Sequence, residues 1–341
     1  MLPNISIIVP AKNEEKVIKN CIESLLNLDY PKDKLEVLVS IDGSTDRTLE
    51  ICKKYEPKIR IIKSKPKKCK AEALNEVIPL TKGEIIGIFD ADCIVDNNCL
   101  KYIAESFADK KVCGVSGVVR SVNCRTIISK TISLETNLTS FLEYTLSKIG
   151  ANPHFFGKNM FIRKDVLEKI GGFGTYSFIE DIELSLKMKR LKYKVSFQPK
   201  AIAWQEEPSN ILSYIKQRER WCRGILRLRR VEIKKSVKNR LSDLMHTIPY
   251  YISPFNLIIG TLYLISNFLN HFSIFRLPLL LLLTLNIFLI ILSSVYHKSI
   301  RNLLYLPIWF VLSNIEVIIF FKSFLDEELG KEMEWFRADR Y

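Results

Sequence analysis

Residues 4–15 read NISIIVPAKNEE, an apolar run rich in isoleucine and valine that stops at a proline and is followed at once by charge. Short continuous runs of this kind are typical of strands buried on both faces of a parallel sheet. Three more follow along the chain, at residues 35–41 (LEVLVSI), 59–63 (IRIIK) and 84–89 (EIIGIF). The stretches between them have helical patterns, at residues 14–26, 45–55 and 71–78. The order βαβαβαβ predicts an open, mostly parallel Rossmann-like α/β sheet with helices on both faces.

Polar turns follow three of the four expected strands. Open α/β sheets bind ligands at the carboxyl ends of their strands, so these turns should meet at one edge. They lie at residues 11–14 (AKNE), 42–46 (DGSTD) and 90–92 (DAD). Acidic groups gathered in this way repel each other unless they hold a cation or a polar ligand. The chain has neither a GxGxxG nor a GxxxxGK[ST] sequence, which argues against a dinucleotide or P-loop site.

Asp90 and Asp92 alternate at the end of an apolar strand. Two carboxylates next to a diphosphate suit Mg²⁺ or Mn²⁺, which would stabilise a departing nucleoside diphosphate. A bare DxD also occurs in solvated turns, but the position at a strand end favours a metal site.

Seven short motifs in order along residues 4–225 give the chain a resemblance to the family 2 glycosyltransferases with a GT-A fold. They are PAKNEE (10–15), IDGSTD (41–46), KAEALN (70–75), DAD (90–92), FGKNM (156–160), IED (179–181) and QRERW (217–221). The last is similar to the QxxRW signature of cellulose, chitin and hyaluronan synthases and ceramide glucosyltransferase. Two positions depart from the usual family pattern: Ile41 replaces the first Asp of DDGS, and Ile179 replaces the Thr of TED.

The resemblance implies a role for each matching residue. Asp181 corresponds to the catalytic base and Asp92 to the metal-binding carboxylate, with Asp90 beside it near the ribose. Residues of the nucleotide-sugar site would be Pro10, Glu14, Asp42, Lys70 and Asp90. Residues of the donor and acceptor sites would be Glu180, Gln217, Arg220 and Trp221.

The residues themselves support a similar interpretation of Asp181. An acceptor hydroxyl is a poor nucleophile at neutral pH and needs a carboxylate to take its proton. Asp181 opens an expected helix over residues 181–193, whose N-terminal dipole would favour the ionised form. A first-turn acid without a catalytic role is the alternative.

Gln217, Arg220 and Trp221 share one face of an expected helix over residues 209–230, because they are spaced three and four residues apart. Arginine can bind phosphate oxygens in pairs, and an indole gives a sugar ring an apolar platform. An amphipathic juxtamembrane helix is the alternative for this face.

Charge and hydropathy divide the chain of 341 residues into two parts. Positions 241–341 hold seven Lys and Arg against eight Asp and Glu, a net charge of −1, so residues 1–240 carry +15 and the whole chain +14. Residues 208–240 alone hold eleven basic residues against two acidic ones. We expect this cluster to attract anionic membrane lipid, and we expect no nucleic-acid partner.

Two segments are long and apolar enough for transmembrane helices, at residues 277–296 and 303–321, and residues 249–268 are a third candidate. The N-terminus has no signal sequence, so we expect a cytoplasmic catalytic domain on a multi-pass membrane protein. Glu316 should face a polar interior. Eight cysteines without metal-ligand spacing predict reduced, mostly buried thiols. The expected organisation is a catalytic domain (1–207), basic interfacial helices (208–242), a membrane domain (243–325) and a charged tail (326–341).

Together these features predict an inverting, metal-dependent membrane glycosyltransferase. It would move a sugar from a nucleotide sugar, UDP-linked by preference, to a lipid or polysaccharide acceptor, and it could assemble as an oligomer. A polyprenyl-phosphate sugar synthase is the alternative within the same chemistry. A sugar-1-phosphate nucleotidyltransferase shares the sheet but should have a glycine-rich loop where this chain has PAKNEE, and a non-catalytic scaffold would not need the acidic crevice.

Overall fold

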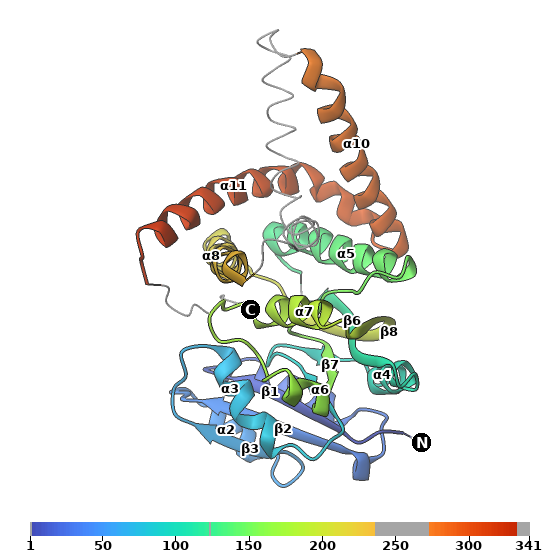
Figure 1. Cartoon of the computed structure of the whole chain (residues 1–341), viewed down its shortest axis with the longest axis vertical. Helices are drawn as coiled ribbons and strands as arrows, with labels where there is room; N and C mark the ends of the chain where they lie inside the picture. The colour runs from blue at the N-terminus through green and yellow to red at the C-terminus, as the bar shows by residue number, and fades with distance from the viewer. Residues whose placement is uncertain (1, 123, 236–272, 333–341) are drawn as a thin grey trace. The chain divides into compact units, whose positions relative to one another are not determined.

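A computed structural model describes residues 2–122, 124–235 and 273–332 of the chain (Figure 1). It divides the chain into two compact units, the first formed by Met1–Val122 and Leu142–Glu206 and the second by Asn123–Phe141 and Glu207–Tyr341. Residues 123–141, which the sequence analysis placed with residues 1–207, lie in the second unit. The expected segment at residues 249–268 lies outside the described residues.

The first unit is an alternating α/β structure, as the sequence predicts. Its first half contains β1 (Ile5–Ala11), α1 (Ile18–Leu26), β2 (Leu35–Asp42), α2 (Thr48–Lys53), β3 (Arg60–Ser64), α3 (Lys70–Val77) and β4 (Ile85–Ile88). Its second half contains β5 (Ile94–Val95), α4 (Cys99–Phe107), β6 (Val112–Val122), β7 (Met160–Arg163), α6 (Lys164–Lys169), α7 (Glu180–Arg190) and β8 (Lys194–Glu206). Two short 3-10 helices, Lys32–Lys34 and Ile78–Leu80, precede β2 and β4.

These strands form one eight-stranded sheet in the order β3-β2-β1-β4-β7-β6-β8-β5. The four strands expected from the sequence are parallel neighbours, but β7 pairs antiparallel with both β4 and β6, and β5 pairs antiparallel with β8. β6 and β8 pair parallel, so the sheet is mixed, with antiparallel pairing only where β7 and β5 take part. The reversal at β7 has a consequence for the site, because Met160 pairs with Ile88 and the residues before β7 thus lie at the edge where β4 ends.

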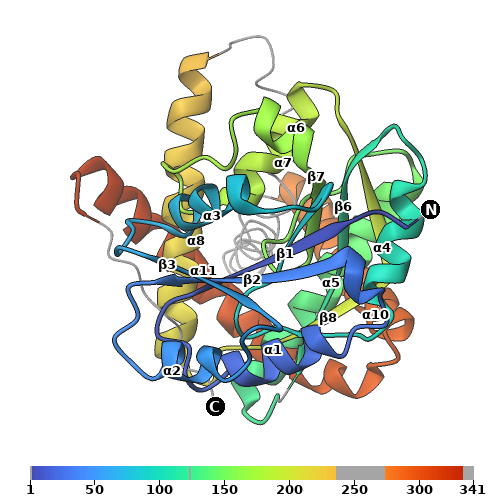
Figure 2. The same ribbon diagram turned by 90° about the horizontal axis from the view of Figure 1, so that it is seen from below.

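Helices cover both faces of the sheet, as expected. Alternate residues of β1 face opposite ways: Ile5, Ile7 and Val9 belong to a core shared with α1, α2 and α4, whereas Ile8 belongs to a core shared with α3, α6 and α7. Figure 2 shows α1 and α2 on one side of β1 and β2 and α3 on the other. Both cores consist mainly of buried aliphatic side chains. This packing fixes the strands and therefore the positions of their ends.

The second unit is helical. It contains the greater part of α5 (Ile127–Lys148), α8 (Ile211–Lys235), α10 (Ser273–Tyr296), the 3-10 helix η3 (Ile300–Tyr305) and α11 (Leu306–Glu328). Small apolar clusters join these helices, one around Tyr214 with Ile132 and Leu312 and another around Trp309 with Leu134 and Ile290.

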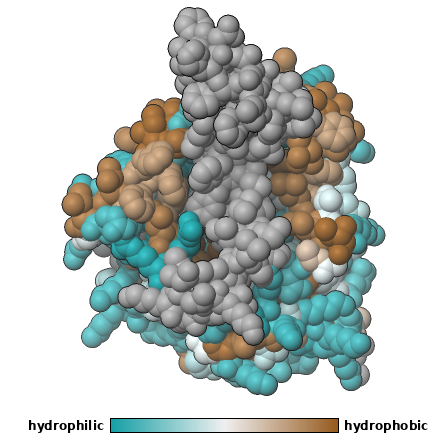
Figure 3. Space-filling model, turned by 45° about the horizontal axis from the view of Figure 1, so that its top comes forward, coloured by the Kyte–Doolittle hydropathy of each residue, from teal (hydrophilic) through white to brown (hydrophobic). Residues whose placement is uncertain are grey.

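Within the described part of the chain, one helical stretch, Ile300–Glu328, is long and apolar enough to cross a membrane, and a shorter apolar helix covers Thr284–Tyr296. The expectation of two or three crossings is therefore not supported. Figure 3 shows apolar surface where α10 and α11 lie.

Candidate active site

The loops after β1 and β2 are locked together by side chains. Asn13 adopts a left-handed backbone conformation with φ 57, which lets its Oδ1 accept a hydrogen bond from the Thr45 amide at 2.8 Å. The Asn13 amide donates in turn to Ser44 Oγ at 3.0 Å. The Glu14 amide donates to Thr48 Oγ1 at 2.7 Å, which ties the same loop to the start of α2. These bonds fix the PAKNEE loop against the IDGSTD loop.

Two of the expected nucleotide-sugar residues, Pro10 and Glu14, belong to the PAKNEE loop region that these bonds fix. Pro10 is the second-last residue of β1, and the Glu14 carbonyl accepts hydrogen bonds from the amides of Val17 and Ile18 just before α1. Both therefore stand at the carboxyl end of the first strand.

Asp42 ends β2 and is buried, with 7% of its surface exposed. Its Oδ1 accepts a hydrogen bond from the Lys67 amide at 2.6 Å, and its Oδ2 lies 3.5 Å from Lys12 Nζ. Two donors from different loops hold this carboxylate at the sheet edge.

Asp90 and Asp92 follow β4. Asp92 is buried, with 4% of its surface exposed, and the Asp90 carbonyl accepts a hydrogen bond from Cys21 Sγ at 3.6 Å. Burial, followed by the negative charges of Asp92 and Asp90, raises the pKa of the Cys21 thiol, and burial and the same two aspartates raise the pKa of the Cys93 thiol. These thiols stay protonated. The eight cysteines, all in the described part of the chain, form no disulfide, and five of them are buried, as expected from the sequence.

The two aspartates fit a divalent ion that also needs a substrate. Mg²⁺ is often held by one or two carboxylates together with the phosphates of its substrate, not by an all-protein cage. Among the described residues, no three His, Cys, Asp or Glu side chains form a group that could hold a metal alone. Asp90 and Asp92 are a pair of hard oxygen donors at the sheet edge. They match a site in which the phosphates of the substrate complete the coordination of the ion.

Lys70, the first residue of α3, contacts both the loop after β4 and the start of α7. Its Nζ lies 2.7 Å from Asp90 Oδ1 and 2.9 Å from Glu180 Oε1, and it donates a hydrogen bond to the Gly157 carbonyl at 3.1 Å. Burial opposes the charged form, but the two carboxylates outweigh it and raise the pKa of Lys70. This ammonium group is therefore a permanent positive charge between two motifs that are 90 residues apart in the sequence.

Asp181 is the second residue of α7, close to the helix start expected from the sequence. Its Oδ2 accepts a hydrogen bond from the Gly157 amide and its Oδ1 from the Ile182 amide, both at 2.9 Å. Burial, followed by the charge of Glu180, raises the pKa of Asp181, whereas Lys70 and these two amides act in the opposite direction. Burial and Glu180 therefore outweigh the groups that favour the ionised form, among them the Ile182 amide in the first turn of α7.

Gly157 lies against three charged groups of this cluster. A Cβ at this position would lie 3.2 Å from Asp181 Oδ2, 3.2 Å from Lys70 Nζ and 3.4 Å from Glu180 Oε1. The FGKNM segment thus brings the Gly157 backbone close to the carboxylates of Asp181 and Glu180.

The QRERW residues belong to the second unit and lie on α8, as expected. Gln217 is buried, and its Oε1 has no hydrogen-bond partner among the described residues. The centre of the Trp221 ring lies 4.4 Å from the guanidinium carbon of Arg218, and Arg220 is half-buried on the same helix. Arg218, for which no role was expected from the sequence, is therefore a cationic partner of Trp221 within the helix.

The profile of the family described as glycosyltransferase like family 2 matches residues 3–224. The chain belongs to this family. It is 29% identical to the probable glycosyltransferase YdaM of Bacillus subtilis over the whole chain and 87% of that protein. It is 30% identical to the beta-monoglucosyldiacylglycerol synthase of Nostoc sp. over 65% of the chain and 49% of that protein, so this match spans about half of the relative.

A further relative of the glycosyltransferase is the poly-beta-1,6-N-acetyl-D-glucosamine synthase of Staphylococcus epidermidis, 25% identical over 98% of the chain and 87% of that protein. Among solved structures, the chain is similar to the mannosyltransferase PcManGT from Pyrobaculum calidifontis in complex with GDP-Man and Mn²⁺. The TM-score is 0.64 at 22% identity, with 97% of this chain and 89% of that one covered. The likeness to PcManGT supports the fold, a mixed GT-A-like α/β sheet with helices.

Sequence reasoning missed two buried polar groups of this glycosyltransferase. In the first unit, His154 Nδ1 lies 2.9 Å from Glu143 Oε1, and the His154 amide donates to Glu143 Oε2 at 2.9 Å. His154 and Phe155 are both buried. They therefore pack in the interior of the first unit.

The second missed group surrounds Arg218 on α8. Arg218 Nε lies 2.7 Å from Glu316 Oε1, its other nitrogen contacts Glu135, and Tyr214 Oη donates to Glu316 at 2.6 Å. Glu316 thus faces a polar interior, as the sequence analysis required. The only signal in the sequence was a carboxylate inside an apolar segment, which indicated that a partner exists but not which one.

Proposed function

We propose that this chain is an inverting, metal-dependent membrane glycosyltransferase that moves a sugar from a nucleotide sugar to a hydroxyl of a lipid or a polysaccharide. One observation carries the proposal: Lys70 contacts both Asp90 and Glu180, so the aspartates at the end of β4 and the acidic pair that opens α7 form one cluster. A donor diphosphate and a proton acceptor are needed within the length of one sugar, and this cluster supplies groups for both.

Asp181 is the proposed general base. A hydroxyl must lose its proton as it attacks the anomeric carbon, and a base works best when its pKa lies near the working pH. Burial and Glu180 raise the pKa of Asp181, which makes it a stronger proton acceptor than an exposed aspartate. Its two backbone hydrogen bonds fix the direction of the carboxylate. Attack from the side opposite the diphosphate would invert the anomeric centre.

Asp90 and Asp92 are the proposed holders of Mg²⁺ or Mn²⁺. The ion would supply positive charge to the leaving diphosphate. Asp42, Lys70, Pro10 and Glu14 surround the same sheet edge and are the proposed contacts of the nucleotide sugar. The Mn²⁺ and GDP-Man named with PcManGT support this class of cofactor and donor.

The acceptor is proposed to be a membrane lipid. The name of the Nostoc relative indicates transfer to a diacylglycerol lipid, and that of the Staphylococcus relative indicates polysaccharide synthesis. A chain-translocating channel needs many membrane helices, which favours a single transfer to a lipid here. Gln217, Arg220 and Trp221 are the proposed donor and acceptor contacts on α8, and the catalytic unit is proposed to face the cytoplasm.

The test is an assay of membranes that contain the full chain, with labelled UDP-glucose, UDP-N-acetylglucosamine and GDP-mannose offered in turn. We expect a labelled product in the organic extract that carries a β-linked sugar. Label that mild acid releases from the extracted lipid as free sugar would instead indicate a polyprenyl-phosphate sugar synthase, because the glycosyl phosphate bond is acid-labile and a glycoside of a lipid hydroxyl is not. An α-linked product, or no transfer from any donor, would contradict the proposal.

A further inference from the structure

Arg218 lies against two aromatic rings of its own helix, α8. Its guanidinium carbon is 4.4 Å from the centre of the Trp221 ring and 4.9 Å from the centre of the Tyr214 ring. The three residues are spaced four and three positions apart, so they share one side of the helix. A guanidinium group at this distance is attracted to the face of an indole and can stack on it. One side of Trp221 is therefore in contact with a cation.

Two carboxylates fix the guanidinium group of Arg218. Only 5% of this residue is exposed, its Nε lies 2.7 Å from Glu316 Oε1 on α11, and a second nitrogen donates to Glu135 on α5. Tyr214 Oη donates to Glu316 at 2.6 Å, so this carboxylate is held in its turn. Helices α5, α8 and α11 thus meet at one cation, and its position does not depend on Trp221.

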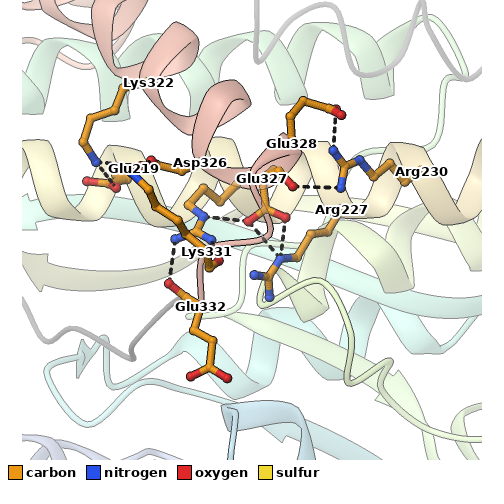
Figure 4. A network of polar contacts seen from close by, with 10 residues as sticks. Glu219, Arg227, Arg230, Lys322, Asp326, Glu327, Glu328, Lys331 and Glu332 are labelled. Carbon is orange, nitrogen blue, oxygen red and sulfur yellow. Dashed lines mark hydrogen bonds and ion pairs between the residues drawn. The ribbon is translucent and has the colours of Figure 1, made fainter.

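The backbone of α8 is also fixed on the other side of Trp221. Arg223 Nε lies 2.6 Å from one carboxylate oxygen of Glu327 on α11, and Arg227 Nε lies 2.9 Å from the other. Figure 4 shows Arg227 at this carboxylate. The helix is therefore bound to α11 both before and after Trp221, so the rotation of the indole about its own side-chain bonds is the freedom that Arg218 restricts.

The remaining surface of Trp221 suits a sugar ring. Trp221 is half-buried, and among the described residues no ring or cation other than Arg218 lies against it. Gln217, four positions earlier on the same face, is 8% exposed, and its Oε1 has no hydrogen-bond partner in the described part of the chain. A buried oxygen without a donor is costly, and a ligand hydroxyl would supply one. A sugar ring could thus stack on the indole and donate to Gln217.

We propose that Arg218 is a positioning residue for Trp221: it holds one side of the indole, so that the rest of the ring meets a bound sugar at a fixed angle. This rests on the proposed function, in which Trp221 is a donor or acceptor contact, and it adds a residue that does not itself touch the substrate. Arginine suits the task because its planar group stacks on a ring while its edge binds carboxylates. Lysine has the same charge but no plane.

The first measurement observes Trp221 directly. The chain has four tryptophans, so the full chain labelled with fluorotryptophan in detergent should give four fluorine resonances, and Trp221→Phe and Trp309→Phe identify two of them. The test variant is Arg218→Lys, because a neutral residue would leave two buried carboxylates without their cation. The matched control is Arg230→Lys, in an exposed ion pair on the same helix.

We expect Arg218→Lys to shift the resonance of Trp221 and to leave that of Trp309 in place. Trp309 packs with Leu134 and Ile290 and so reports on the packing of the second unit. Arg230→Lys should shift neither resonance. An unchanged Trp221 resonance in Arg218→Lys would overturn the proposal, and so would an equal shift at Trp309, because the substitution would then disturb the unit as a whole.

The second measurement asks whether Arg218 affects transfer through Trp221. Arg218→Lys is made in the parent and in Trp221→Leu, and initial rates are compared with the donor that labels the organic extract. We expect a loss of about tenfold in the parent, because misplaced contacts are costly in rate. In Trp221→Leu we expect a change of less than about twofold, because there is no ring left to hold.

Equal losses in the two backgrounds would contradict the proposal, because Arg218 would then act independently of Trp221. Parental rates in Trp221→Leu would instead refute the role of Trp221 in the proposed function. The fluorine measurement needs no substrate, so it tests the positioning of the ring separately from the reaction.

Discussion

Lys70 Nζ lies 2.9 Å from Glu180 Oε1 while it also contacts Asp90, so one ammonium group joins the proposed metal-binding edge to the helix that carries the proposed base. Its positive charge lowers the pKa of Asp181 against the larger effects of burial and Glu180. Lys70 therefore has a part in setting the pH at which Asp181 can accept a proton.

Replacement of Lys70 should move the pH dependence of transfer. Loss of the charge in Lys70→Met raises the pKa of Asp181 further, so the base is protonated over a wider acidic range. We expect the acidic limb of the kcat/KM profile to move to higher pH, whereas Lys70→Arg, which keeps the charge, should move it less. The profile is measured with saturating metal. A limb that stays in place in Lys70→Met would show that Asp181 is not the titrating base.

Gly157→Ala should reduce transfer more than stability. The new Cβ would lie 3.2 Å from Asp181 Oδ2 and from Lys70 Nζ, so the charged groups must shift by a few tenths of an ångström. We expect a loss of about tenfold in kcat, because misplacement of reacting groups is expensive in rate. Gly171→Ala is the matched control.

At Gly171 a Cβ meets nothing within 4 Å, but φ is +78. That substitution should cost about 1–2 kcal/mol of stability and leave kcat near the parent value. Thermal unfolding and initial rates measured on the same samples separate the two effects. Equal losses of activity in both variants would contradict the assignment of Gly157 to the site.

Removal of divalent metal should abolish transfer, and Asp92→Asn should increase the Mn²⁺ concentration needed for half-maximal rate by at least about tenfold. Asp92 is buried at the edge where the diphosphate is proposed to bind, so a neutral amide there removes a charged oxygen ligand. Asp96→Asn is the control, because Asp96 lies four residues further on and accepts a hydrogen bond from the Asn98 amide. An unchanged metal requirement in Asp92→Asn would exclude Asp92 as a ligand.

The stability of the second unit should fall as the pH rises, and Glu135 should contribute to this. Burial, followed by the charges of Glu316 and Glu207, outweighs Arg218 and raises the pKa of Glu135 to about 8. The protonated form is thus favoured by folding, so its stabilising effect is complete below the ordinary pKa of 4.5 and is lost as the pH rises through 8.

Glu135→Gln, which resembles the protonated form, should reduce the loss of melting temperature between pH 5 and pH 8. Glu328→Gln, in an exposed ion pair with Arg230, should not. Thermal unfolding of the full chain in detergent at the two pH values gives the comparison. The same pH dependence in the parent and Glu135→Gln would show that another group is responsible.

The sequence predicted the first half of the sheet well, because β1 to β4 are continuous apolar strands separated by amphipathic helices. It did not predict β6, β7 and β8. Residues 112–122 (VCGVSGVVRSV) contain glycine or serine at four of eleven positions, and β8 is interrupted opposite Gly117 and Val118, where its register shifts. The antiparallel position of β7 depends on its partners β4 and β6. No local sequence pattern predicts the direction in which a strand pairs.

The candidate site was predicted in its residue types but not in its contacts. The resemblance to the family named Lys70, Asp90, Glu180 and Asp181 separately. Their assembly around Gly157 needs the reversal of β7, which returns the FGKNM segment to the edge where β4 ends. Arg218 was missed because its partners Glu135 and Glu316 are 83 and 98 residues away in the sequence.

The most direct test of the account compares Asp181→Asn with the parent enzyme in sugar transfer and in donor binding. We expect the rate of transfer to fall by about 10²- to 10⁴-fold, the usual contribution of a general base, while the Kd of the nucleotide sugar changes little. Asp165→Asn, which alters an acid in the first turn of α6, should leave both unchanged. Undiminished transfer by Asp181→Asn would contradict the account.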